Sequence, residues 1–150
     1  EYLMIYKHKQ QKCFMIKSGW VALGMIKDAS KLLKEQEISF EENDVIVLYS
    51  DGITEAINQN KKDGNERMFG EELLIKAIED APNIEGKIKS ARSIFKNISI
   101  TLSKFMGYQH IQLDDITLLT IQYRSDAYKK ENDCSEELTE DFITEWKWGK

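Results

Sequence analysis

The sequence predicts an α+β fold, in which strands and helices are grouped along the chain. Three observations predict it: β-type runs come first, two helical patterns lie together in the middle, and another apolar strand follows them. This order differs from the strict β-α alternation that indicates a parallel sheet. With 150 residues, of which 41% are hydrophobic and 31% charged, the chain holds enough apolar material for one compact domain.

The first part of the chain is β-rich. The runs YLMIY (2–6) and CFMIK (13–17) are separated by a polar segment, so they predict a β-hairpin. Further along, Ile38 and Phe40 alternate with polar residues, which indicates a half-exposed strand. The run VIVLY (45–49) is continuously apolar, and this is typical of a strand that is buried on both faces.

Two helices are predicted in the middle of the chain. In FGEELLIKAIEDAP (69–82), apolar residues recur at helical spacing, glutamates occupy the first turn, and Pro82 stops the helix. From Ile84 onward, apolar positions recur in steps of three and four for about 22 residues. These positions are Ile88, Ala91, Phe95, Ile98, Leu102 and Phe105. Such a stripe is more typical of a helix that packs against a sheet than of a helix in a coiled coil.

The run ITLLTIQY (116–123) predicts a second strand of the buried type, and the composition changes after it. Residues 125–150 contain eight acidic and four basic residues. We therefore predict a domain over residues 1–124 and an acidic tail over residues 125–150. In the tail, four apolar residues could form one face of a short amphipathic helix: Leu138, Phe142, Ile143 and Trp146. This face could dock on the domain, dock on a partner or have no stable docking site, and all three alternatives stay open.

Charge and cysteine content narrow the function classes. The formal net charge of −5 argues against nucleic-acid binding, which needs clustered lysine and arginine, and favours a phosphoprotein or small-molecule partner. Cys13 and Cys134 are far apart and form no C-x-x-C motif, so the sequence suggests neither a zinc site nor a disulfide framework. We therefore expect the protein to be located in a reducing cytoplasm. The sequence has no apolar run of membrane-spanning length, and its first residues lack the basic-then-apolar pattern of a signal peptide. Because it begins without Met inside a strand-like run, we expect it to be part of a longer protein.

Acidic residues stand at the ends of two apolar runs. Asp51 follows VIVLY, and Asp114 and Asp115 precede ITLLTIQY. If the two strands are antiparallel neighbours, these carboxylates lie at the same end of the sheet, where a hard cation such as Mg²⁺ or Mn²⁺ would bind them and offset their mutual repulsion. The pattern alone favours the other interpretation, because Asp-Gly is a common turn and paired aspartates are common in solvated loops.

Three sequence blocks favour the first interpretation. DVIVLYSDGITEAIN, FGEELL and QLDDITLLTI follow one another in an order and spacing that resembles the C-terminal half of bacterial metal-dependent protein phosphatases. This is the PPM group, related to protein phosphatase 2C, in the branch typified by the stage II sporulation protein E phosphatase. The resemblance extends from about residue 2 to residue 124. It implies part of an α-β-β-α fold, an antiparallel β-sandwich flanked by helix pairs.

The resemblance also implies the roles of individual residues. Asp51, in the Asp-Gly motif, and Asp114, first in the Asp-Asp-Ile-Thr motif, correspond to ligands of one metal ion. Gly52, Asp115 and Thr117 would support them. In the complete domain, two Mn²⁺ or Mg²⁺ ions hold a bridging water that attacks phosphoserine or phosphothreonine, so no catalytic residue is expected beyond the metal ligands. The implied substrate is a phosphoprotein of the anti-anti-sigma-factor type, and a regulatory domain is expected upstream.

The sequence departs from the family pattern at its start. The family's bridging Asp has no counterpart here, because Asp28 is the only Asp before Asp44 and lacks the Asp-Gly context. We therefore expect the parent protein to be the enzyme and this chain alone to be inactive. Two alternatives are a non-catalytic pseudophosphatase or regulatory binding module, and a protein that binds a divalent ion for structural purposes.

Overall fold

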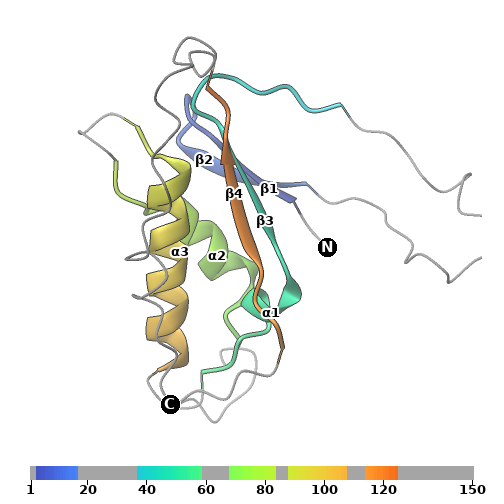
Figure 1. Ribbon diagram of the computed structural model, residues 1–150, viewed down its shortest axis with the longest axis vertical. Helices are drawn as coiled ribbons and strands as arrows, with labels where there is room; N and C mark the ends of the chain where they lie inside the picture. Colours follow the sequence, from blue (N-terminus) through green and yellow to red (C-terminus); the bar gives the residue numbers. More distant parts are fainter. Residues whose placement is uncertain (1–2, 17–36, 59–67, 84–87, 108–113, 125–150) are drawn as a thin grey trace, which may run out of the picture.

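The computed structural model describes residues 3–16, 37–58, 68–83, 88–107 and 114–124. In these residues an antiparallel sheet carries helices on one face (Figure 1). This arrangement confirms the predicted α+β class. Residues 17–36, and the acidic tail of residues 125–150, lie outside the described residues.

The sheet has four strands in the order β2-β1-β3-β4, and each neighbouring pair is antiparallel. The strands are β1 (Leu3–Lys7), β2 (Lys12–Ile16), β3 (Val45–Tyr49) and β4 (Leu118–Gln122). The predicted hairpin is confirmed, because β1 pairs directly with β2. In the central pair, Tyr49 at the end of β3 lies opposite Leu118 at the start of β4. Two segments that are distant in sequence therefore meet at one end of the sheet.

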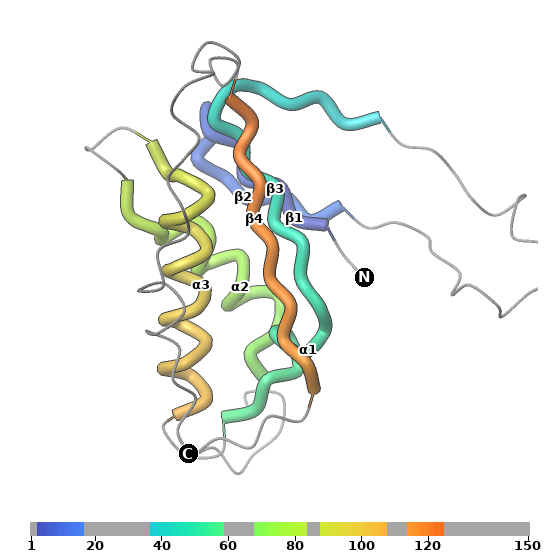
Figure 2. The backbone as a smooth tube through the Cα atoms, in the orientation of Figure 1, coloured from blue at the N-terminus to red at the C-terminus, as the bar shows by residue number. Residues whose placement is uncertain are grey.

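The described residues also form three helices (Figure 2). They are α1 (Asp51–Thr54), α2 (Gly70–Glu79) and α3 (Ala91–Met106). As predicted, α2 ends before Pro82. However, α3 begins later than Ile84, because the hydroxyl of Ser90 accepts a hydrogen bond from the Ser93 N–H at 3.0 Å and so caps the helix there.

The core lies between the sheet and the helices α2 and α3. Its sheet side consists of alternate residues of β1 and β3, and its helix side is led by residues spaced four apart on α3. These are Met4, Tyr6, Val45, Val47 and Tyr49 from the sheet, and Ile94, Ile98, Leu102 and Met106 from α3. An edge-to-face contact between Phe69 and Phe105, with centroids 5.3 Å apart, joins the start of α2 to the end of α3.

The opposite face of the sheet is apolar and partly open. On β3 the burial alternates, and Leu48 is 39% exposed; on β4, Leu119 and Ile121 are 49% and 45% exposed. The prediction that β3 and β4 are buried on both faces is therefore wrong for the described residues, because α2 and α3 cover one face. The register aligns the apolar side chains of the other face in two cross-strand rows: Ile16, Leu3, Leu48 and Leu119, then Phe14, Ile5, Ile46 and Ile121.

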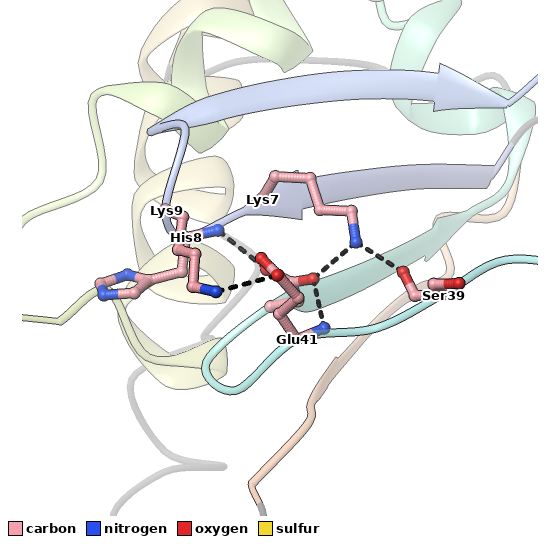
Figure 3. Close-up of polar contacts among 6 residues, drawn as sticks. Lys7, His8, Lys9, Ser39 and Glu41 are labelled. Carbon is pink, nitrogen blue, oxygen red and sulfur yellow. Dashed lines mark hydrogen bonds and ion pairs between the residues drawn. The ribbon is translucent and has the colours of Figure 1, made fainter.

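The predicted strand at Ile38 and Phe40 is also not observed. Both side chains are half-buried between exposed neighbours, so the predicted alternation is present, but the segment is not a strand. A side chain engages this backbone instead, since the Lys7 ammonium donates a hydrogen bond to the carbonyl oxygen of Ser39 at 2.6 Å (Figure 3).

The same ammonium pairs with a buried carboxylate that fixes the start of β3. Asp44 is fully buried and accepts hydrogen bonds from Lys7 Nζ at 2.7 Å and from the N–H groups of His8 and Glu41 at 2.9 and 2.8 Å. Burial alone raises the pKa of Asp44, but these hydrogen bonds outweigh it and hold that pKa below its ordinary value. This anchor joins the loop before β3 to the β1-β2 hairpin.

Candidate metal centre

The sheet register places the predicted acidic residues at one end of the β3-β4 pair. Asp51 begins α1, directly after β3, and Asp114 and Asp115 lie just before β4. Figure 1 shows α1 beside the start of β4. We call Asp51, Asp114 and Asp115 the acidic rim. The neighbouring antiparallel strands on which the prediction depended are therefore present.

Ser50 joins the two sides of the acidic rim. Its N–H donates to the carbonyl oxygen of Thr117 at 3.0 Å, which extends the β3-β4 pairing by one step. Its hydroxyl donates to the carbonyl oxygen of Asp115 at 2.9 Å and accepts from the N–H of Thr117, also at 2.9 Å. The backbone between β3 and α1 is thus fastened to the backbone that leads into β4.

Gly52 allows the two segments to approach closely. A Cβ atom at this position would lie 2.4 Å from the carbonyl oxygen of Asp115 and 3.0 Å from its carbonyl carbon. Both are backbone atoms, which cannot turn aside as the end of a flexible side chain can. The glycine of the Asp-Gly motif is therefore required by packing between the two acidic segments.

The carboxylates of the acidic rim face solvent on a fixed backbone. Asp51, Asp114 and Asp115 are all exposed. The carbonyl oxygen of Asp51 accepts from the N–H of Glu55 at 2.8 Å and the hydroxyl of Thr54 at 3.2 Å, which closes the short turn of α1. On the other side, the N–H of Asp115 donates to Asp114 Oδ1 at 2.8 Å.

The donor chemistry of the acidic rim fits part of a site for a hard divalent cation. Carboxylate oxygens from two chain segments are the ligands that Mg²⁺ and Mn²⁺ prefer. Among the described residues, no group of three or more His, Cys, Asp or Glu side chains lies close enough together to hold an ion. Asp51 and Asp114 would accordingly supply part of a coordination shell, and the remaining positions would need other ligands or water.

The other supporting residues predicted from the sequence differ in their contacts. Gly52 and Asp115 touch through the backbone, as described above. Thr117 is exposed and is joined to Ser50 through its own N–H and carbonyl groups. Ser50 was not predicted; its place between an apolar strand and the Asp-Gly motif was the one available signal, and the pairing with Thr117 requires the tertiary structure.

Cys13 is separate from the acidic rim. It lies on β2, its N–H donates to Glu79 Oε1 at 2.9 Å, and its side chain packs against the core. Burial, and secondarily the charge of Glu79, raise the pKa of the Cys13 thiol to about 12. The thiol is therefore protonated at neutral pH and is a poor nucleophile.

No helix in the described parts of the chain has both the length and the apolar character needed to cross a membrane.

Comparisons with known proteins agree on one kind of domain. The family model described as "Stage II sporulation protein E (SpoIIE)" matches residues 1–124. Among solved structures, the "SiaA-PP2C domain of Pseudomonas aeruginosa" is similar, with a TM-score of 0.58 and 17% sequence identity. The similarity covers 81% of this chain and 43% of that chain, and at this identity it shows the fold alone. A search of curated proteins finds no match.

Proposed function

Because the chain belongs to the stage II sporulation protein E (SpoIIE) family of PPM-type phosphatases, we propose that its acidic rim is one part of the metal centre of a protein serine/threonine phosphatase. The observation that carries this proposal is the joining of the two acidic segments. Ser50 hydrogen-bonds to both Asp115 and Thr117, and Gly52 leaves room for the Asp115 carbonyl group. A turn that only reverses the direction of the chain does not require two separate segments to be joined in this way.

In the proposed site, Asp51 and Asp114 bind the same Mn²⁺ or Mg²⁺ ion. Asp115 adds negative charge beside them, while Gly52 and Thr117 hold the backbone. The complete domain would contain two such ions, with the remaining ligands coming from outside the described residues. When bound, ions of this type lower the pKa of coordinated water and neutralise charge on phosphoryl oxygens. The role of this chain is to hold two carboxylates at a fixed separation on a solvent-accessible edge.

The proposed substrate is phosphoserine or phosphothreonine on a regulatory phosphoprotein of the anti-anti-sigma-factor type. Family membership supports the phosphoprotein class, and the exposure of the acidic rim supports access by a protein-sized substrate. The high pKa of Cys13 supports hydrolysis without a cysteine phosphoenzyme. The two widely separated cysteines support a reducing compartment, so we place the reaction in the cytoplasm.

The proposal is tested by hydrolysis of a phosphoserine peptide by the full-length protein. We expect activity that requires Mn²⁺ or Mg²⁺, disappears with a chelator and returns when the metal is restored. Asp51→Asn and Asp114→Asn should each lower activity by more than roughly 100-fold, because losing a ligand should cost at least as much as losing an outer-shell partner.

Asp80→Asn is a matched control. Asp80 is exposed and caps the C-terminal end of α2, so the same chemical change there should leave the activity within about twofold of wild type. Activity that survives both rim substitutions would refute the site. A folded protein that binds the phosphoprotein and hydrolyses nothing at any metal concentration would instead identify a regulatory binding module.

A further inference from the structure

We propose that Ser50 is a positioning residue, which sets the separation of the two metal-binding carboxylates by fastening one acidic segment to the other. This inference rests on the proposed function and adds a residue to it. Its basis is the two-sided hydrogen bonding of one hydroxyl group. Ser50 Oγ donates to the carbonyl oxygen of Asp115 and accepts from the N–H of Thr117, both at 2.9 Å.

A serine hydroxyl is well suited to this task because it is a donor and an acceptor at once. Asp51 follows Ser50 directly, so its position depends on the Ser50 backbone. On the other side, Asp115 is bonded through its carbonyl group, and its N–H in turn donates to Asp114 Oδ1. Two hydrogen bonds, joined through the covalent backbone of Asp115, therefore link Ser50 to the carboxylate of Asp114.

The exposure of this region separates a positioning role from a merely structural one. Ser50 is only half-buried, and Asp115 and Thr117 are exposed. If the hydroxyl is removed, water can satisfy the released N–H and carbonyl groups, so the loss should cost little global stability. The relative placement of Asp51 and Asp114 would nevertheless loosen, and metal affinity is sensitive to such outer contacts.

The test compares Ser50→Ala, Ser50→Thr and Ser99→Ala in the full-length protein, with Mn²⁺ binding measured from the loss of the free-ion electron paramagnetic resonance signal. Threonine keeps the hydroxyl, and the extended backbone of Ser50, with φ −87° and ψ 161°, accepts a β-branched residue. Ser99→Ala removes a serine hydroxyl whose bond stays inside α3, to the carbonyl oxygen of Phe95.

We expect Ser50→Ala to weaken Mn²⁺ binding by roughly 10-fold to 100-fold, as loss of an outer-shell partner does in other metal sites. Its melting temperature without metal should stay within about 4 °C of wild type. Ser50→Thr should restore binding to within about threefold, and Ser99→Ala should leave it unchanged. With Mn²⁺ at saturation, the hydrolysis rate of Ser50→Ala should recover, because the defect lies in holding the ion.

Wild-type Mn²⁺ affinity in Ser50→Ala would overturn the positioning role, and so would a failure of Ser50→Thr to restore it. Two outcomes separate this inference from the proposed function. If the wild type hydrolyses no phosphopeptide while Ser50→Ala still weakens Mn²⁺ binding, the phosphatase assignment fails and the positioning role stands. If the wild type binds no Mn²⁺, both fail.

Discussion

At the scale of single residues, Gly52 shows why the Asp-Gly pair is more than a turn. Its α-carbon faces the backbone of the other acidic segment, where a side chain has no room. Gly52→Ala should lower the free energy of unfolding by about 1–3 kcal/mol, because the Asp115 carbonyl group must move away. The same substitution should weaken Mn²⁺ binding, measured by titration calorimetry.

Gly70→Ala is the control for this prediction. Gly70 has a φ of +71°, so alanine there is strained, yet a Cβ atom would meet no atom within 4 Å. This control should cost about 1–2 kcal/mol of stability and leave Mn²⁺ binding intact. Equal effects of the two substitutions on binding would remove the special role given to Gly52.

Asp44 is the second residue for which we make a prediction, and this prediction concerns the free energy of unfolding. Asp44→Asn removes the charge that pairs with Lys7, whose side chain is 22% exposed. The free energy of unfolding, from urea denaturation, should fall by about 2–3 kcal/mol, slightly less than the loss of a fully buried pair. Glu41→Gln removes the exposed Lys9–Glu41 pair and should cost less than about 1 kcal/mol.

The effect of Asp44 should depend on pH. Its pKa is lower in the folded protein than in the unfolded chain, where it is near its ordinary value. The charged form therefore stabilises the fold above that ordinary pKa, and this stabilisation is lost as the pH falls through the lowered folded value. The stability difference between wild type and Asp44→Asn should be full at pH 7 and should shrink at about pH 3. A difference that grows in acid would contradict this account.

At the scale of elements, local patterns predicted some boundaries well and others poorly. β3 and the β1-β2 hairpin have the expected positions, because a short apolar run between polar segments is a local signal. The start of α3 was predicted too early because apolar spacing continues upstream of the residue that caps the helix. Ile38 and Phe40 alternate like a strand, but a strand also needs a hydrogen-bonding neighbour, and Lys7 engages the Ser39 carbonyl instead.

The cap of α3 leads to a prediction of its own. Ser90→Ala removes the acceptor for the Ser93 N–H and should lower the free energy of unfolding by about 1 kcal/mol. Ser103→Ala, at an exposed position in the last turns of the same helix, should be neutral or slightly stabilising because alanine favours helix. If both variants are equally stable in thermal unfolding, the helix start at Ala91 is not fixed by this cap.

At the scale of the whole molecule, the open apolar face of the sheet differs from the burial on both faces that the two apolar runs predict. VIVLY and ITLLTIQY carry apolar side chains toward both faces, as strands inside a layered fold do, yet α2 and α3 cover one face. The predicted β-sandwich would place a second sheet against the other face. The burial predicted from the sequence would then belong to the complete sandwich.

This interpretation is testable with Leu119, which is 49% exposed on β4. If a second sheet covers it in the full-length protein, Leu119→Ser should cost about 2–4 kcal/mol of stability, as in a core. Leu73→Ser, at a 37% exposed position on α2, should cost less than about 1 kcal/mol. If both substitutions lower the free energy of unfolding by similar, small amounts, the apolar face of the sheet stays open in the full-length protein.

The acidic residues themselves were predicted because two local signals coincided with a family pattern, whereas the contacts that join them depend on the register of β3 and β4.

The central claim, that Asp51 and Asp114 hold the same ion, is tested most directly by a double-mutant cycle on Mn²⁺ affinity in the full-length protein. We predict that Asp51→Asn and Asp114→Asn each weaken Mn²⁺ binding. The loss of binding free energy in the double variant should be smaller than the sum of the two single losses by about 1 kcal/mol or more. Strictly additive losses, or either substitution leaving Mn²⁺ affinity unchanged, would contradict a shared ion.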